Sequence, residues 1–113
     1  MAILAAILAL HVSFTAPTHT PKVNTRWNFK ITATLNGKPA KAKLTLQVID
    51  PLGSAHYIQH GTTNKNLHNW PFTGVYRDFA IWPPSSRGIP LVLRATVTAS
   101  GLKRVVKYTV TPR

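Results

Sequence analysis

The chain has 113 residues and no cysteine, so it is long enough to fold around one hydrophobic core, and disulfides and cysteine-based metal sites are excluded. Hydrophobic residues make up 44% of the sequence and charged ones 14%, which excludes a disordered chain. Fourteen Lys and Arg stand against two acids, giving a net charge of +12. Nucleic acid, anionic lipid and acidic envelope polymers are therefore candidate partners, and a solvated basic surface without a partner explains the charge equally well.

An apolar stretch, Ala2–Leu10, opens the chain. It is about half as long as a bilayer-spanning helix, which argues against a transmembrane span. It matches the hydrophobic part of a secretory signal, although no basic leader precedes it and no clean small-x-small cleavage site follows. We therefore expect a signal-like segment at 1–10, a folded domain at 11–113, and a protein that is exported and either secreted or held at the cell surface.

Beyond residue 20, apolar and polar side chains alternate with a period of two, which predicts half-buried β-strands. In 26–35, for example, Trp27, Phe29 and Ile31 alternate with polar residues, and Asn36-Gly37 then supplies a turn. With a first strand around 11–16, the predicted strands are 11–16, 26–35, 42–49, 55–59, 67–72, 75–82, 91–99 and 106–110.

These seven or eight short strands have no helical stretch between them, which excludes parallel βαβ units. The economical architecture is two antiparallel sheets packed face to face. We therefore expect an all-β fold, an Ig-like antiparallel β-sandwich, with a small closed barrel as the alternative.

Several short motifs recur in a known group of proteins. They are Thr18-His19-Thr20-Pro21-Lys22, Trp27 on the following strand, Gly37-Lys38-Pro39, Gly74 before Arg77, and Trp82-Pro83 with Ser86-Arg87-Gly88. With these motifs, nearly everything after residue 11 resembles the small exported Ig-like domain proteins of actinobacteria, a group without a characterised function. The resemblance implies an Ig-like fold and an export route, and it transfers no catalytic residue.

Catalytic machinery is not recognisable in the sequence. Two acids in different segments are too few to expect a glycosidase-type pair. No Gly-rich phosphate loop or nucleophile elbow occurs, and Asp50, Ser54 and His56 make a Ser-His-Asp trio only on paper because they occupy one turn. We expect a protein that is not an enzyme and needs no cofactor.

Histidines offer a weak alternative as metal ligands. His56 and His60 would lie roughly 13 Å apart on a strand, too far to share one ion. His68 could approach either of them across a hairpin. Solvent-facing histidines on an edge strand are the favoured interpretation, and copper or zinc binding through His56, His60 and His68 is the alternative.

The tryptophans have different expected roles. Trp27 is in phase with the core, and Trp82 is expected to cap it at a strand end. Trp70, beside Pro71, is the best candidate for an exposed residue that stacks on a sugar or an unpaired base.

Four cations fall on the outward phase of three strands that an Ig-like order makes neighbours: Lys41, Lys43, Arg94 and Lys107. They predict a cationic stripe on one sheet face, and we expect a non-catalytic interaction module that binds an anionic cell-envelope polymer or nucleic acid. The first alternative is an assembly subunit that pairs through its edge strands, and the second is a histidine-based metal-binding accessory protein.

Overall fold

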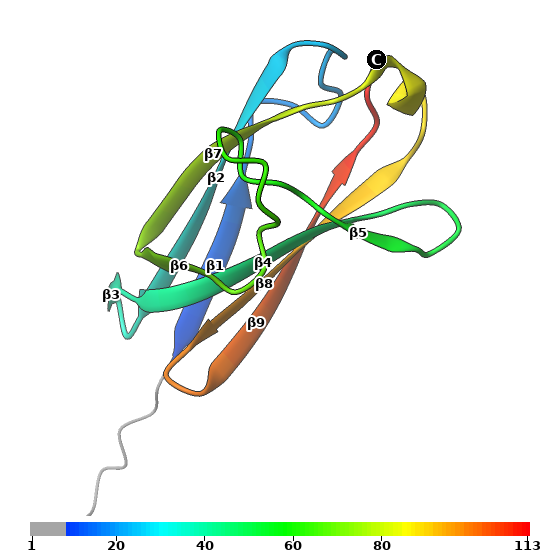
Figure 1. Ribbon diagram of the computed structural model, residues 1–113. Helices are drawn as coiled ribbons and strands as arrows, with labels where there is room; N and C mark the ends of the chain where they lie inside the picture. Colours follow the sequence, from blue (N-terminus) through cyan, green and yellow to red (C-terminus); the bar gives the residue numbers. More distant parts are fainter. Residues whose placement is uncertain (1–8) are drawn as a thin grey trace, which may run out of the picture.

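The computed structural model describes residues 9–113, which form two antiparallel β-sheets packed as a β-sandwich (Figure 1). The first sheet contains β1 (Leu10–Thr15), β2 (Arg26–Leu35), β3 (Lys38–Pro39) and β7 (Val75–Ile81). The second sheet contains β4 (Lys41–Ile49), β5 (Ala55–Tyr57), β6 (Trp70–Thr73), β8 (Leu91–Ala99) and β9 (Leu102–Val110). A short 3₁₀ helix, Pro84–Ser86, follows β7. The expected all-β, Ig-like sandwich is confirmed.

Strand pairing puts β2 at the centre of the first sheet and β4 and β8 at the centre of the second. β2 pairs with β1 along one edge and with β7 and β3 along the other. β4 pairs with β8, and β8 pairs with β9, while β5 and β6 pair along the other edge of β4. The β4–β5 hairpin projects from the body of the sandwich (Figure 1).

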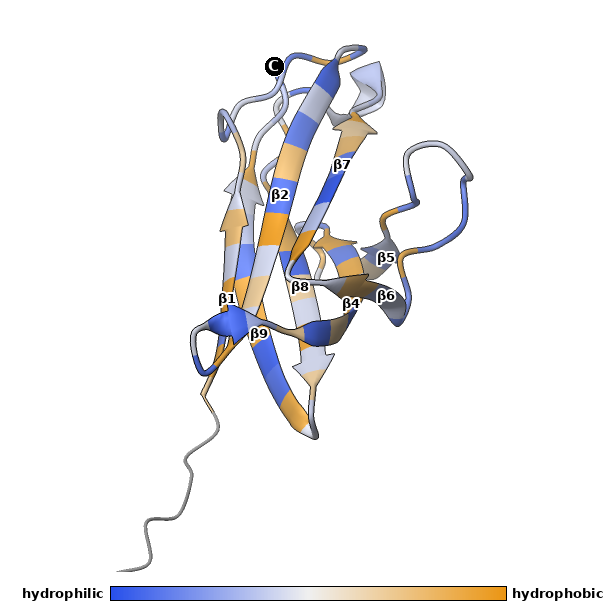
Figure 2. Ribbon diagram, turned by 90° about the vertical axis from the view of Figure 1, so that its left-hand side faces the viewer, coloured by the Kyte–Doolittle hydropathy of each residue, from blue (hydrophilic) through white to orange (hydrophobic). Residues whose placement is uncertain are grey.

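The core lies between the sheets, where the inward residues of both meet. Figure 2 shows the alternation of hydrophilic and hydrophobic residues along β2. On that strand Ile31 is fully buried, and Leu44 and Leu46 of β4 are fully buried in the opposite sheet. Burial of these side chains removes apolar surface from water, which is the main favourable contribution to folding.

Trp27 and Trp82 belong to this core, as the sequence predicted. They are 3% and 5% exposed, and their rings meet edge to face at 5.7 Å between centroids. The indole N–H of Trp27 donates to the Thr18 carbonyl at 2.9 Å, so its burial does not leave that donor unsatisfied.

Several strand boundaries differ from the expectation, and the last strand differs most, because β9 begins at Leu102 rather than at residue 106. β1 begins at Leu10, which is 2% exposed, one residue before the expected strand at 11–16; residues 1–8 of the signal-like segment lie outside the described residues. β6 begins at Trp70 rather than at residue 67, and it tolerates Pro71 because, within residues 9–113, it pairs with β4 along one edge and with no strand along the other. The two-residue β3 was not predicted, because so short a strand has no alternation to recognise.

None of the helical structure within residues 9–113 has the length and apolar character needed to cross a membrane.

Candidate functional site

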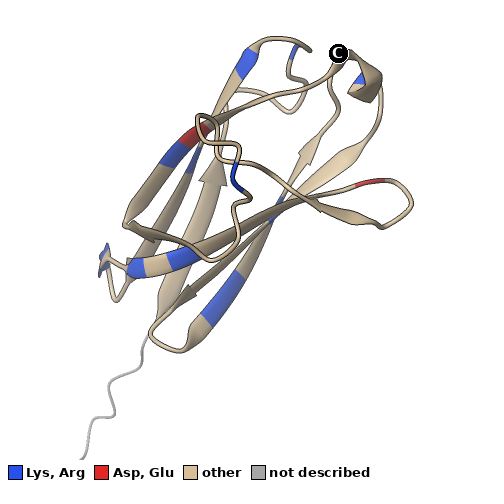
Figure 3. Ribbon diagram, viewed as in Figure 1, with Lys and Arg blue, Asp and Glu red and all other residues tan. Residues whose placement is uncertain are grey.

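The outer face of the second sheet carries a group of cations from three neighbouring strands. Burial alternates along β4, with Ala42 and Leu44 buried and Lys41 and Lys43 exposed, so the odd-numbered residues of β4 point outward. The same alternation places even-numbered residues of β8 and odd-numbered residues of β9 on this face. We call it the cationic face, and its charged residues are Lys41, Lys43, Arg94, Lys103 and Lys107 (Figure 3).

The strand register arranges four of these five cations in two rows across the sheet, and Lys41 lies beyond them, at the end of β4. Lys43, Thr98 and Lys103 form one row, with the neutral Thr98 between the two lysines. Gln47, Arg94 and Lys107 form the other. Because neighbouring strands lie about 4.8 Å apart, the two lysines of the first row are about 10 Å apart at the backbone.

Arg94 is the most enclosed of the five cations. Its side chain is half-buried, and its guanidinium Nη2 donates to Oε1 of Gln47 at 2.8 Å. Gln47 is neutral, so this hydrogen bond orients the guanidinium without neutralising its charge.

No acid among residues 9–113 lies on the strands of this face, because the only two acids of the chain are elsewhere. Asp50 follows the end of β4, and its carboxylate contacts the His56 ring at 3.0 Å and accepts the backbone N–H groups of Leu52 and Ser54. These hydrogen bonds, the one with His56 first, lower the pKa of Asp50 below its ordinary value. Asp78 belongs to β7 in the first sheet. The positive charge of the cationic face is therefore uncompensated.

A groove of about 690 Å³ lies at one end of the cationic face. It forms where β4 and β8 separate, because their pairing stops at Lys43 and Thr98 while β4 continues to Lys41. Polar side chains around it come from β4, β6, β8 and the β8–β9 turn: Lys41, Lys43, Thr73, Thr98 and Ser100. Two ammonium groups and three hydroxyls can together bind an anionic, hydrogen-bonding segment of a ligand.

The four cations that sequence reasoning placed on one face do lie on one face, and a binding role for them stays a prediction. Lys103 was not among the expected residues. The signal for it was present, because Lys103 shares the outward phase of β9 with Lys107.

Trp70 is not exposed, contrary to the expectation. It is half-buried against the core, and the His60 ring stacks on it at 4.7 Å and 21°. Nδ1 of His60 also lies within hydrogen-bond distance of the Thr62 and Thr63 hydroxyls, at 3.3 and 3.1 Å. A ligand that stacked on this face of Trp70 would first have to displace His60.

The three candidate metal ligands have different neighbours. His56 contacts Asp50, His60 stacks on Trp70, and His68 lies 5.3 Å from the Tyr57 ring. Within the part of the chain that the structure describes, no three His or acidic side chains are grouped as metal ligands would be. The structure thus gives the metal-binding alternative no preformed site among those residues.

The trio of Asp50, Ser54 and His56 has a structural explanation. Asp50 accepts the backbone N–H of Ser54 at 3.0 Å, as it does that of Leu52 at 2.9 Å. Such carboxylate-to-backbone bonds are typical of turn formation, and here they close the β4–β5 hairpin.

The sequence matches no protein-family model and no curated protein. Among solved structures, the human F-spondin reeler domain is similar, with a TM-score of 0.64 at 12% identity over 90% of this chain and 89% of that one. A DUF4426 family protein from Pseudomonas aeruginosa PAO1 aligns over 94% of this chain and 92% of that one, with 15% identity and a TM-score of 0.46. A DUF4466 family protein from Parabacteroides merdae ATCC 43184 is also 15% identical, covers 93% of this chain and 44% of that one, and has a TM-score of 0.49. The likeness to the reeler domain concerns the fold alone.

Proposed function

We propose that the protein is an exported, non-catalytic binding module that holds an anionic cell-envelope polymer against its cationic face. The observation that carries the proposal is the arrangement of five cations on one side of one sheet, with no acid on its strands among residues 9–113. Cations spaced in rows suit a chain with repeated negative charges, because each unit of the polymer can meet one of them.

Export is the part of the proposal that rests on sequence. The apolar stretch Ala2–Leu10 and the resemblance to exported actinobacterial domains support it. Outside the cell, the acidic polymers of the envelope are the abundant polyanions, and for that reason we favour them over nucleic acid.

Assembly through edge strands is the weaker alternative at β9. Among residues 9–113 this strand pairs in the ladder with β8 alone, although the His19 ring contacts the Thr109 carbonyl on its other edge. Lys103, Arg104 and Lys107 lie along it, and a second copy of β9 would bring like charges together. Charged residues on an edge strand oppose such pairing.

Matched charge variants test the proposal. The face variant carries Lys41→Gln, Lys43→Gln and Lys107→Gln, and the control variant carries Lys22→Gln, Lys38→Gln and Lys65→Gln, three exposed lysines from other parts of the surface. Both lose three charges. Their affinity for fluorescently labelled poly(glycerol phosphate), and for a labelled DNA duplex, is measured by anisotropy.

We expect the face variant to bind poly(glycerol phosphate) about tenfold more weakly or worse, and the control variant to stay within about twofold of the wild type, because only close contacts release counterions. Equal losses in both variants would mean that net charge, and not the cationic face, binds the polymer. Stronger binding to the DNA duplex would contradict the choice of polymer.

A further inference from the structure

The outer face of the first sheet brings two other cations directly together. Across the strands, Thr15 of β1 lies opposite Lys30 of β2, and Lys30 lies opposite Arg77 of β7. The β-carbons of such opposite residues are about 5 Å apart. Like charges in this position destabilise a sheet, so the pair needs a reason to persist.

Neither cation forms an ion pair within residues 9–113, where the only salt bridge joins His56 and Asp50. Asp78 follows Arg77 in sequence and also borders this face, but its carboxylate accepts hydrogen bonds from the Tyr76 hydroxyl and from the backbone N–H of Gly61, at 3.1 Å for the latter. Those donors are neutral. The Asp78 carboxylate therefore keeps its charge and offsets one of the two cations, and the net positive charge that remains in the groove is not neutralised within the described residues.

A groove of about 650 Å³ lies over the pair, within the size range of small-molecule sites. Lys30 is half-buried, so part of its hydration is lost and an unpaired charge there is costly. Beside Asp78, the groove is lined by these two cations, by further hydrogen-bonding side chains and by an aromatic ring: Thr15, Asn28, Lys30, Thr62, Arg77 and Phe79.

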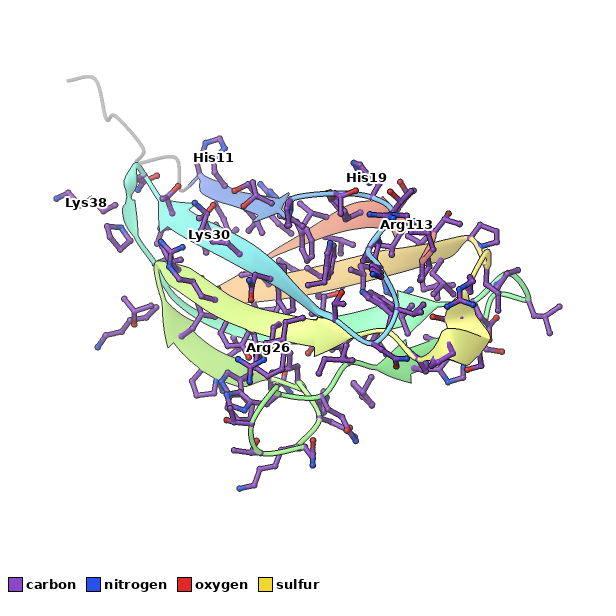
Figure 4. All side chains as sticks on the ribbon, turned by 90° about the horizontal axis from the view of Figure 1, so that it is seen from above. His11, His19, Arg26, Lys30, Lys38 and Arg113 are labelled. Atoms are coloured by element: carbon purple, nitrogen blue, oxygen red, sulfur yellow. The ribbon has the colours of Figure 1, made fainter. Side chains whose placement is uncertain are left out.

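The wall of the groove is held in place from two sides. The Arg26 guanidinium lies 4.1 Å from the centre of the Phe79 ring, which fixes the ring by a cation–π contact. Figure 4 labels Arg26 and Lys30, which both come from β2. On the other side, Gly61 packs so closely that an added Cβ would lie 2.8 Å from Phe79. The groove is thus already formed without a ligand.

We propose that this groove binds a phosphate monoester carried by a small polar molecule. The Arg77 guanidinium can donate two parallel N–H bonds to phosphate oxygens, and Lys30 adds a second positive charge. A phosphate monoester brings three acceptor oxygens and a charge of about −1.5 to −2 at neutral pH, so it can contact both cations at once, whereas a carboxylate has only two oxygens to share between them. Thr15, Asn28 and Thr62 supply hydrogen bonds to the rest of the molecule.

This site goes beyond the proposed function, because it lies on the other sheet and takes a discrete group rather than a chain. The test is an NMR titration of the ¹⁵N-labelled protein, in a buffer without phosphate, with glucose 6-phosphate. Glucose 6-sulfate and glucose are the comparison ligands. The variants are Arg77→Gln, Lys30→Gln, Lys38→Gln as an equal-charge control on β3, and Lys43→Gln on the cationic face.

We expect saturable shifts at the amides of Lys30, Thr62 and Arg77, and an affinity about tenfold or more lower in Arg77→Gln and in Lys30→Gln, because each removes a charge-assisted hydrogen bond to the phosphate. Lys38→Gln and Lys43→Gln should stay within about twofold of the wild type, because neither residue lines the groove. Glucose 6-sulfate should bind more weakly, and glucose should cause no shifts there.

Shifts spread over all surface cations, equal losses in Lys38→Gln, or no saturable shift would overturn the proposal. Each of these outcomes leaves polymer binding by the cationic face untouched. Both groove variants should melt no lower than the wild type without ligand, because each removes a like-charge repulsion. This check separates impaired binding from impaired folding.

Discussion

The two outer faces of the sandwich follow the same alternation of side chains but distribute positive charge differently. On the second sheet, five cations are spread over β4, β8 and β9: Lys43 and Lys103 are separated by the neutral Thr98, while Arg94 lies opposite Lys107. On the first sheet, Lys30 and Arg77 are direct neighbours over a groove. A net charge of +12 therefore does not define a binding mode, whereas the placement of the charges does: cations spread over three strands of an open face suit a polymer, and a single pair over a groove suits one compact group.

Both faces depend on one core, and removing part of it should affect both. Leu44 is fully buried on β4, directly beneath the cationic face. Leu44→Ala leaves a cavity, and we expect it to lower the free energy of unfolding by about 2–5 kcal/mol. Urea denaturation measures this loss. Val105→Ala, at a position that is 47% exposed, is the control and should change stability far less. Similar losses in the two variants would contradict the position of the core.

A substitution at Gly61 tests the two proposed binding sites separately, because it changes the charge of neither face. An added Cβ would lie 2.5 Å from Oδ1 of Asp78 and 2.8 Å from the Phe79 ring, so Gly61→Ala must move the loop away from the groove. We expect a destabilisation of about 1–3 kcal/mol, typical of overpacking. Binding of glucose 6-phosphate should weaken, and binding of poly(glycerol phosphate) should not change. If both ligands lost affinity equally, the two sites would not be independent.

The Tyr76 hydroxyl donates a hydrogen bond to the Asp78 carboxylate, and the titration of Tyr76 is sensitive to that hydrogen bond. Burial, and then the hydrogen bond to Asp78, raise the pKa of Tyr76 above its ordinary value of 10.0. The folded protein therefore keeps this proton more tightly than the unfolded chain, and stability should fall as the pH rises above about 10. Burial raises the pKa of Tyr108 as well, so Tyr108 contributes in the same direction.

Tyr76→Phe should thus reduce this alkaline dependence without abolishing it. At neutral pH the variant removes one of the donors to the half-buried Asp78, and we expect a loss of about 1 kcal/mol in the free energy of unfolding. Thermal melts at neutral and alkaline pH provide the measurement. An alkaline dependence identical to that of the wild type would show that Tyr76 ionises normally.

Sequence alone predicts the strands well where alternation is long. The expected strand 91–99 coincides with β8, and residues 26–35 coincide with β2. The alternation along β4 and β8 also predicted the outward direction of Lys43 and Arg94. Neighbouring residues on one strand point to opposite faces for geometric reasons, so no tertiary information is needed for this step.

What sequence could not supply is contact between segments that are distant in the chain. The adjacency of Lys30 and Arg77 requires both the pairing of β2 with β7 and its register, which no local pattern encodes. Trp70 was expected to be exposed because it lies beside Pro71 and near His68, but the long loop before it brings His60 onto its ring. Such packing depends on the path of the loop, which the alternation of side chains along the strands does not predict.

The most direct test of the account is the salt dependence of poly(glycerol phosphate) binding in the wild type, the face variant and Arg77→Gln. The slope of log K against log salt is negative, and each lysine that meets a phosphate of a single chain adds roughly 0.7 to its magnitude. We therefore expect the magnitude of the slope to be smaller by about two in the face variant. Arg77→Gln should keep the slope of the wild type. If the magnitude of the slope decreased in proportion to the charge removed from either face, the claim that one face holds the polymer would be contradicted.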